Sequence, residues 1–123
     1  MTLRARLPVA VGIDVGSTNT KVVAVTADGA VVARASRPTR RAGTDLSVDA
    51  AALVLAIEDM VVEVCGDSRV IHALCVAGIG EDGVLVDGLL RPLTPALAWF
   101  DPRRHAVFEA LRPDLVDDDS FDV

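Results

Sequence analysis

A ten-residue segment near the start of the chain, GIDVGSTNTK, combines residue types that could bind phosphate. An acid follows a run of β-branched residues, and a lysine follows a turn of small residues. Glycine allows close backbone approach, hydroxyl and amide groups donate to phosphate oxygens, and lysine supplies a compact positive charge. An acid here could hold a metal ion that also touches the phosphates. The segment predicts phosphate binding by Gly16, Ser17, Thr18, Asn19 and Lys21, and metal binding by Asp14.

The same segment also fits an ordinary β-hairpin, in which Asp14 forms the turn and Lys21 is solvated. The apolar run that leads into Asp14 favours the phosphate site, because it buries the strand whose end carries the acid. Two commoner nucleotide motifs are absent from the sequence: GxxxxGK[ST], and GxGxxG at the start of a helix.

The first half of the chain must position this segment with three strands. Alternating and β-branched apolar residues, with a turn at Asp28-Gly29, predict an antiparallel meander. The three strands are predicted at 9–15, 21–26 and 30–36. An exposed loop with three arginines is predicted after them, at 37–45.

A helix and a further strand follow. The helix is predicted at 48–65, with Ser47 as its N-cap, Asp49 in its first turn and Gly66 at its end. The apolar run at 70–77 predicts a buried strand that returns parallel to the first, and 84–86 predicts a fifth. Because the first strand does not lead directly into a helix, this order favours an α/β mixed sheet over a doubly wound dinucleotide fold.

Composition narrows the possible partners. The 123 residues carry a net charge of −6 and a pI of about 4.7, which argues against nucleic acid and anionic membranes as main partners. No apolar run is long enough to span a membrane. Cys65 and Cys75 form no CxxC pair and lie among apolar residues, so both are predicted to be buried thiols in a reducing, cytoplasmic protein.

A second stretch, at 77–103, carries a glycine-rich polar turn, then VLVD, RPL and WFDPR. Together with GIDVGSTNTK and its DG hairpin, it resembles the FGGY family of carbohydrate kinases within the actin-like ATPase superfamily, over roughly residues 9 to 104. The resemblance implies a ribonuclease H-like mixed five-stranded sheet with flanking helices. It divides the chain into an arm at 1–8 and part of an N-terminal domain at 9–123, an incomplete first lobe.

The resemblance implies roles for particular residues. Asp14 would position Mg²⁺, and the turn after it would surround the transferred phosphate of ATP. Glu81, Trp99 and Asp101 would bind the sugar or polyol, since carboxylates accept hydrogen bonds from hydroxyls and Trp can cover an apolar sugar face. Each has another interpretation: a solvated turn acid, a core side chain and a helix cap before Pro102, respectively. Ile79-Gly80-Glu81 departs from the family's usual Gln-Met-His or Gln-Arg-Glu.

The general base and the second domain of such a kinase are expected downstream of this chain. The chain is therefore predicted to be a non-catalytic N-terminal part of an enzyme that phosphorylates a sugar or polyol, and oligomerisation would cover its apolar surface. Two alternatives stay open: an ATPase activator of the same superfamily, and a remnant that kept the fold and lost the chemistry.

Overall fold

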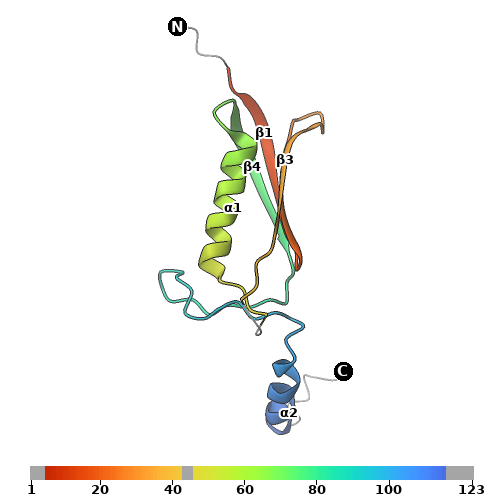
Figure 1. Cartoon of the computed structure of the whole chain (residues 1–123), viewed down its shortest axis with the longest axis vertical. Coiled ribbons are helices and arrows are strands. Elements are labelled where there is room, and N and C mark those ends of the chain that lie inside the picture. Colours follow the sequence, from red (N-terminus) through yellow and green to blue (C-terminus); the bar gives the residue numbers. More distant parts are fainter. Residues whose placement is uncertain (1–4, 43–45, 116–123) are drawn as a thin grey trace.

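The computed structural model describes residues 5–42 and 46–115. Figure 1 shows α1 lying along the sheet and α2 standing apart from it. Neither of these helices is long and apolar enough to cross a membrane. In chain order the elements are β1 (Leu7–Val15), β2 (Asn19–Val25), β3 (Val31–Pro38), α1 (Ala50–Cys65), β4 (Arg69–Gly78) and α2 (Arg103–Leu115).

The strands form one mixed sheet in the order β3-β2-β1-β4. β1 pairs antiparallel with β2 and parallel with β4, and β2 pairs antiparallel with β3. The predicted meander and the predicted parallel return strand are both confirmed. β1 begins at Leu7, so the last two residues of the predicted arm belong to the sheet, and residues 1–4 lie outside the described part.

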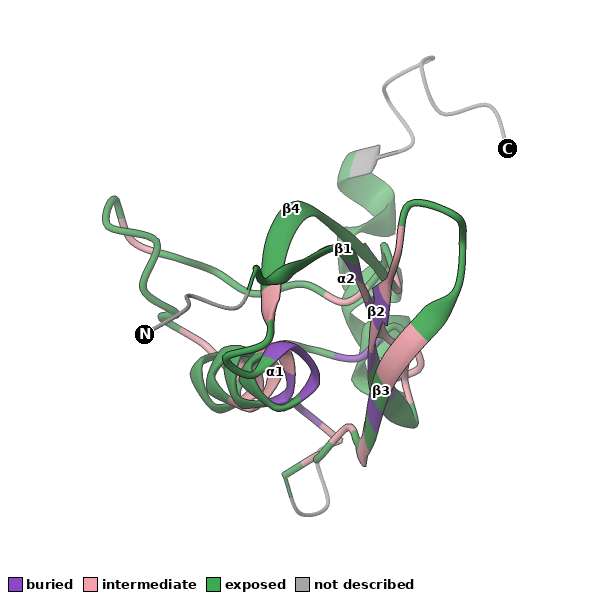
Figure 2. Ribbon diagram, turned by 90° about the horizontal axis from the view of Figure 1, so that it is seen from above, coloured by how far each residue is buried: buried purple, intermediate pink, exposed green. Residues whose placement is uncertain are grey.

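The core lies between α1 and one face of the sheet (Figure 2). Alternation along β1 and β2 turns every second side chain towards the helix, where apolar burial stabilises the fold by roughly 25 cal/mol per Å². Met60 of α1 is fully buried at its centre. The buried cluster is Val9, Val11, Ile13, Val22, Ala24, Ala35, Met60, Val64 and Cys65.

The prediction that β4 is buried is wrong for the described residues. Apart from half-buried Arg69, every residue of β4 is exposed, and Val76 keeps 60% of its accessible surface. The cause is its place at the sheet edge, away from most of α1 (Figure 2). Cys75 is therefore an exposed thiol, against prediction, whereas Cys65 is buried as predicted.

The described residues form four strands rather than the predicted five. Of residues 84–86 only Val86 makes a bridge, an isolated one with Pro92. Glycines and prolines recur through this segment, proline gives no N–H to a ladder, and Leu90 turns the chain at φ 60°. The segment is an irregular loop that extends from the end of β4.

The first residue of α1 is fixed by Asp49 rather than by the predicted Ser47. The Asp49 carboxylate accepts a hydrogen bond from Ala52 N–H at 2.9 Å, as an N-cap does. Ser47 is buried two residues earlier, where its carbonyl accepts a backbone hydrogen bond from Ala42. The predicted end is confirmed, since Gly66 at φ 51° donates its N–H to the Val62 carbonyl.

Candidate functional site

The predicted phosphate turn connects β1 to β2 and is tightly closed. Gly16 N–H donates to the Asn19 carbonyl at 3.1 Å, and a Cβ on Gly16 would lie 2.7 Å from that oxygen. Thr39, just after β3, braces the turn: its hydroxyl donates to the Gly16 carbonyl at 2.8 Å, and its N–H donates to the Thr18 carbonyl at 2.9 Å. The sequence therefore needs glycine at position 16 for close backbone approach.

Asp14 and Lys21 face each other across the turn. They are register partners on β1 and β2, and the Lys21 Nζ lies 3.7 Å from an Asp14 carboxylate oxygen. Both side chains are more than half exposed, at 58% for Lys21 and 54% for Asp14. They lie on the sheet face opposite α1, because Ile13 and Val22 beside them point into the core. The pair can therefore receive an anionic ligand from solvent.

A metal ion with phosphate would fit this arrangement. The described residues contain no group of three or more His, Cys, Asp or Glu that could hold a metal by themselves. Mg²⁺ does not require such a group, since it binds through one or two carboxylates together with phosphate oxygens and water. Asp14 is an exposed carboxylate of that kind, beside a turn with backbone and hydroxyl groups that suit phosphate oxygens.

Two of the three predicted substrate residues line one cavity. It has a volume of about 920 Å³ and opens between the turn after β4 and the segment before α2. Glu81 and Trp99 are both exposed there. Arg104 lies 5.8 Å from the centre of the Trp99 ring and donates to the Trp99 carbonyl at 2.7 Å. Trp99 is thus not a core residue but an open aromatic surface beside a cation.

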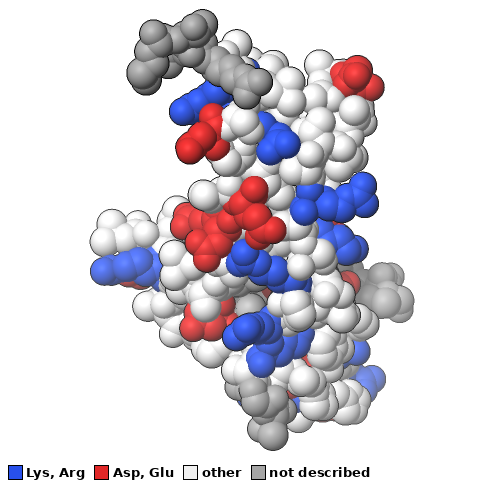
Figure 3. Space-filling view, turned by 45° about the horizontal axis from the view of Figure 1, so that its top comes forward, with Lys and Arg blue, Asp and Glu red and all other residues white. Residues whose placement is uncertain are grey.

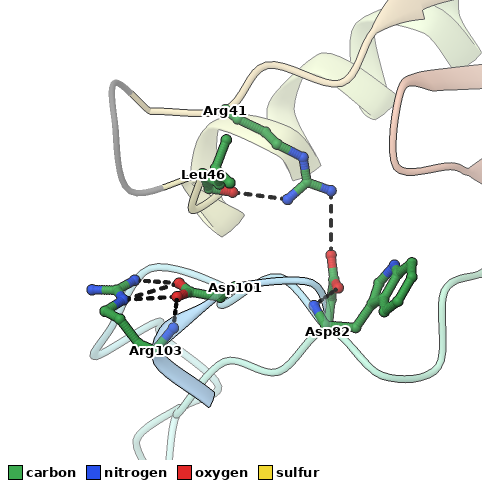
Figure 4. Close-up of polar contacts among 6 residues, drawn as sticks. Arg41, Leu46, Asp82, Asp101 and Arg103 are labelled. Carbon is green, nitrogen blue, oxygen red and sulfur yellow. Dashed lines mark hydrogen bonds and ion pairs between the residues drawn. The ribbon is translucent and has the colours of Figure 1, made fainter. Parts of the chain in front are cut away.

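Asp101 does not line that cavity, and its carboxylate is hydrogen-bonded to Arg103. Its side chain is only 7% exposed, and it accepts hydrogen bonds from the Arg103 guanidinium and from the Arg103 backbone N–H (Figure 4). The side-chain hydrogen bond from Arg103 is the main cause that lowers the pKa of Asp101 to about 2. The capping interpretation accounts for this geometry.

Arg41 and Asp82 connect the two candidate segments, and the sequence analysis did not single them out. Arg41 comes from the loop after β3, which was predicted to be exposed, yet its side chain is 13% exposed. It lies 3.5 Å from the Asp82 carboxylate (Figure 4). Its Nε–H donates to the Ser17 carbonyl at 3.3 Å. No periodicity marks a single buried side chain in a loop, so the sequence alone offered no signal for it.

Exposed charges of both signs lie on the surface of the molecule. On the face drawn in Figure 3, acidic and basic side chains lie next to one another rather than in separate fields. At physiological salt such exposed charges are screened within about 8 Å. Specific pairs, rather than a broad potential, therefore set the electrostatics of the face in Figure 3.

Comparison with solved structures identifies the class of fold. A xylulose kinase from Rhodospirillum rubrum superimposes with a TM-score of 0.75 and 26% identity, over 86% of this chain and 23% of that one. A gluconate kinase from Lactobacillus acidophilus superimposes with a TM-score of 0.76 and 20% identity, over 88% of this chain and 23% of that one. The predicted actin-like ATPase fold is thus confirmed as that of sugar kinases.

The sequence itself identifies the family. Residues 9–122 match the N-terminal domain of the FGGY family of carbohydrate kinases, and the chain belongs to that family. An L-fuculokinase from Salmonella typhi is 29% identical over 109 residues, which cover 80% of this chain and 22% of that protein. The chain therefore spans less than a quarter of the length of these relatives.

Proposed function

We propose that this chain supplies the phosphate-binding side of an enzyme that transfers a phosphoryl group from ATP to a hydroxyl of a sugar or polyol. The observation that carries the proposal is the exposed Asp14–Lys21 pair beside the closed Gly16 turn. Family membership supports it, because the matched family consists of carbohydrate kinases.

Each residue of the turn has a physical task in this proposal. Asp14 would hold Mg²⁺, and the ion would supply positive charge to offset the negative charge of the phosphates. Asp14 orients that ion, and Lys21 stabilises negative charge that develops during the transfer. Gly16 brings backbone N–H groups of the turn close to the phosphate, and Ser17 and Thr18 add hydroxyl donors.

The cavity beside Trp99 is proposed to bind the acceptor. Glu81 accepts hydrogen bonds from sugar hydroxyls, and the Trp99 ring covers an apolar face of the sugar. Asp101 acts indirectly here: with both oxygens bonded to Arg103, it fixes the start of α2 and so the backbone that carries Trp99.

The test is a coupled assay for ADP on the complete gene product. Mg-ATP is supplied with acceptors suggested by the relatives' names, namely L-fuculose, xylulose and gluconate. We expect ADP release that depends on one acceptor and falls by ~10²–10³-fold in Lys21→Met and Asp14→Asn, the typical effect of removing one charge-stabilising group. Glu81→Gln should raise KM for the acceptor.

Asp67→Asn is the matched control, because Asp67 is an exposed acid in the turn between α1 and β4, at the opposite end of the sheet. It should leave turnover unchanged. ATP turnover that ignores every acceptor would contradict the kinase and favour an ATPase activator. No turnover at all would favour a non-catalytic protein.

A further inference from the structure

Arg41 occupies a position between two segments that are distant in the sequence. Besides its bond to the Ser17 carbonyl, it donates to the Leu46 carbonyl at 2.9 Å. Its remaining terminal nitrogen lies 3.5 Å from the Asp82 carboxylate, and its guanidinium lies 4.8 Å from the centre of the Phe100 ring. All three guanidinium nitrogens of Arg41 therefore face an oxygen atom, and one face of the planar group lies over an aromatic ring.

Asp82 continues this chain of contacts towards the acceptor side. One of its carboxylate oxygens accepts a hydrogen bond from the Trp99 N–H at 2.8 Å, and the other faces Arg41 (Figure 4). Its neighbour Glu81 lines the cavity together with Trp99. An unbroken series of polar contacts thus runs from the Ser17 carbonyl through Arg41 and Asp82 to the Trp99 backbone.

Burial of both partners distinguishes this pair from the other ion pairs found among the described residues. Arg41 and Asp82 are 13% and 20% exposed, whereas Arg91 and Asp87 in the same loop are 71% and 23% exposed. A partly buried pair is screened less by salt, and removal of one partner leaves the other charge poorly compensated. An exposed pair such as Arg91–Asp87 contributes little and touches neither the phosphate turn nor the cavity.

We infer that Arg41 and Asp82 are a positioning pair that fixes the phosphate turn relative to the acceptor segment around Glu81 and Trp99. Neither side chain needs to touch a reactant. Phosphoryl transfer depends on placing donor and acceptor within about 3–3.5 Å in line, and a misplacement of about 1 Å can cost ~100-fold in rate. The inference rests on the proposed kinase function, since the two segments bind the two substrates only in that case.

The test compares five variants of the complete gene product: Arg41→Met, Asp82→Ala, the double variant, Arg41→Lys, and Arg91→Met as the matched control. We expect kcat to fall ~10–100-fold in Arg41→Met and Asp82→Ala, with KM for ATP changed less than threefold. The double variant should lose no more than the worse single variant, because both changes break one connection. Arg41→Lys keeps the charge but not the planar fork, so it should rescue little.

Assays are run well below each variant's unfolding midpoint, so that lost stability does not imitate lost positioning. The inference would be overturned if the losses in kcat multiply in the double variant. It would also be overturned if Arg91→Met changes kcat as much as Arg41→Met does. An unchanged kcat in Arg41→Met would overturn it as well.

A second measurement separates this inference from the proposed function. Amide hydrogen exchange reports opening of the peptides that cover 16–20 and 79–101. In Arg41→Met both should exchange at least tenfold faster, whereas Arg91→Met should leave the exchange of 16–20 unchanged and affect 79–101 much less. If no acceptor is phosphorylated, the kinase proposal fails. Faster exchange in both peptides would still support the inference that Arg41 and Asp82 connect the phosphate turn to the acceptor segment. If only one peptide loosens, the connection is overturned whatever the activity.

Discussion

Replacement of Gly16 by alanine tests the geometry of the phosphate turn most directly. The new methyl carbon would lie 2.7 Å from the Asn19 carbonyl oxygen, closer than real Cβ contacts allow. That oxygen cannot simply move, because it accepts the hydrogen bond from Gly16 N–H that closes the turn. The Gly16 carbonyl is also held, by the Thr39 hydroxyl at 2.8 Å. Relief of the clash therefore costs at least one of these hydrogen bonds.

The magnitude follows from opposing effects. Overpacking of this kind costs about 1–3 kcal/mol. Alanine also lowers the conformational entropy of the unfolded chain, which stabilises the folded state by about 0.4–1 kcal/mol where the native backbone angles suit alanine. We therefore expect the free energy of unfolding to fall by about 1–2 kcal/mol in Gly16→Ala, and nucleotide affinity to fall with it, since the backbone donors move.

Gly88→Ala is the matched control. A Cβ on Gly88 meets nothing within 4 Å, and its φ is not positive, so this change should be neutral or stabilising by up to ~1 kcal/mol. Urea denaturation followed by circular dichroism measures both variants, and an unchanged slope shows that the shift in midpoint reports stability. Equal midpoints for the two variants would refute the close approach at Gly16.

Two further predictions concern the helix starts. Asp49→Ala removes the cap on Ala52 N–H and should lower the free energy of unfolding by about 0.5–2 kcal/mol, whereas Glu58→Ala, on the exposed side of α1, should change it by less than ~0.5 kcal/mol in urea denaturation. The pKa of Asp101 is lowered to about 2, so its stabilising effect is present above about pH 4 and is lost as pH falls towards 2. Arg103→Gln should raise that pKa in an NMR titration and reduce the loss of stability between pH 4 and 2; an unmoved pKa would contradict the assigned cause.

Local signals in the sequence predicted most of the fold. β-branched runs predicted β1, β2 and β3, and Gly66 marked the end of α1, because these features depend on neighbouring residues. The N-cap was misplaced because Ser47 and Asp49 are both good caps by type. Only tertiary packing distinguishes them: it buries Ser47, whose carbonyl accepts a hydrogen bond from Ala42 N–H.

Predictions that depended on distant contacts succeeded less well. An apolar run predicts burial, but β4 is an edge strand, and the sequence does not say which strands end at an edge. The phosphate turn was found because its residues are contiguous. Arg41 was missed because its contacts at Ser17 and Asp82 come from segments far away in the chain, which a single sequence cannot bring together.

The topology explains why those segments meet. The crossover through α1 makes β4 parallel to β1, so their carboxyl ends lie at the same edge of the sheet. Val15 and Gly78 are register partners there, and a Cβ on Gly78 would lie 3.6 Å from Val15, so the two strand ends pack closely. The phosphate turn and the acceptor turn therefore leave the sheet side by side. Two loops that leave the same end of the sheet can still vary in separation, and the Arg41–Asp82 pair is a contact that restricts this freedom.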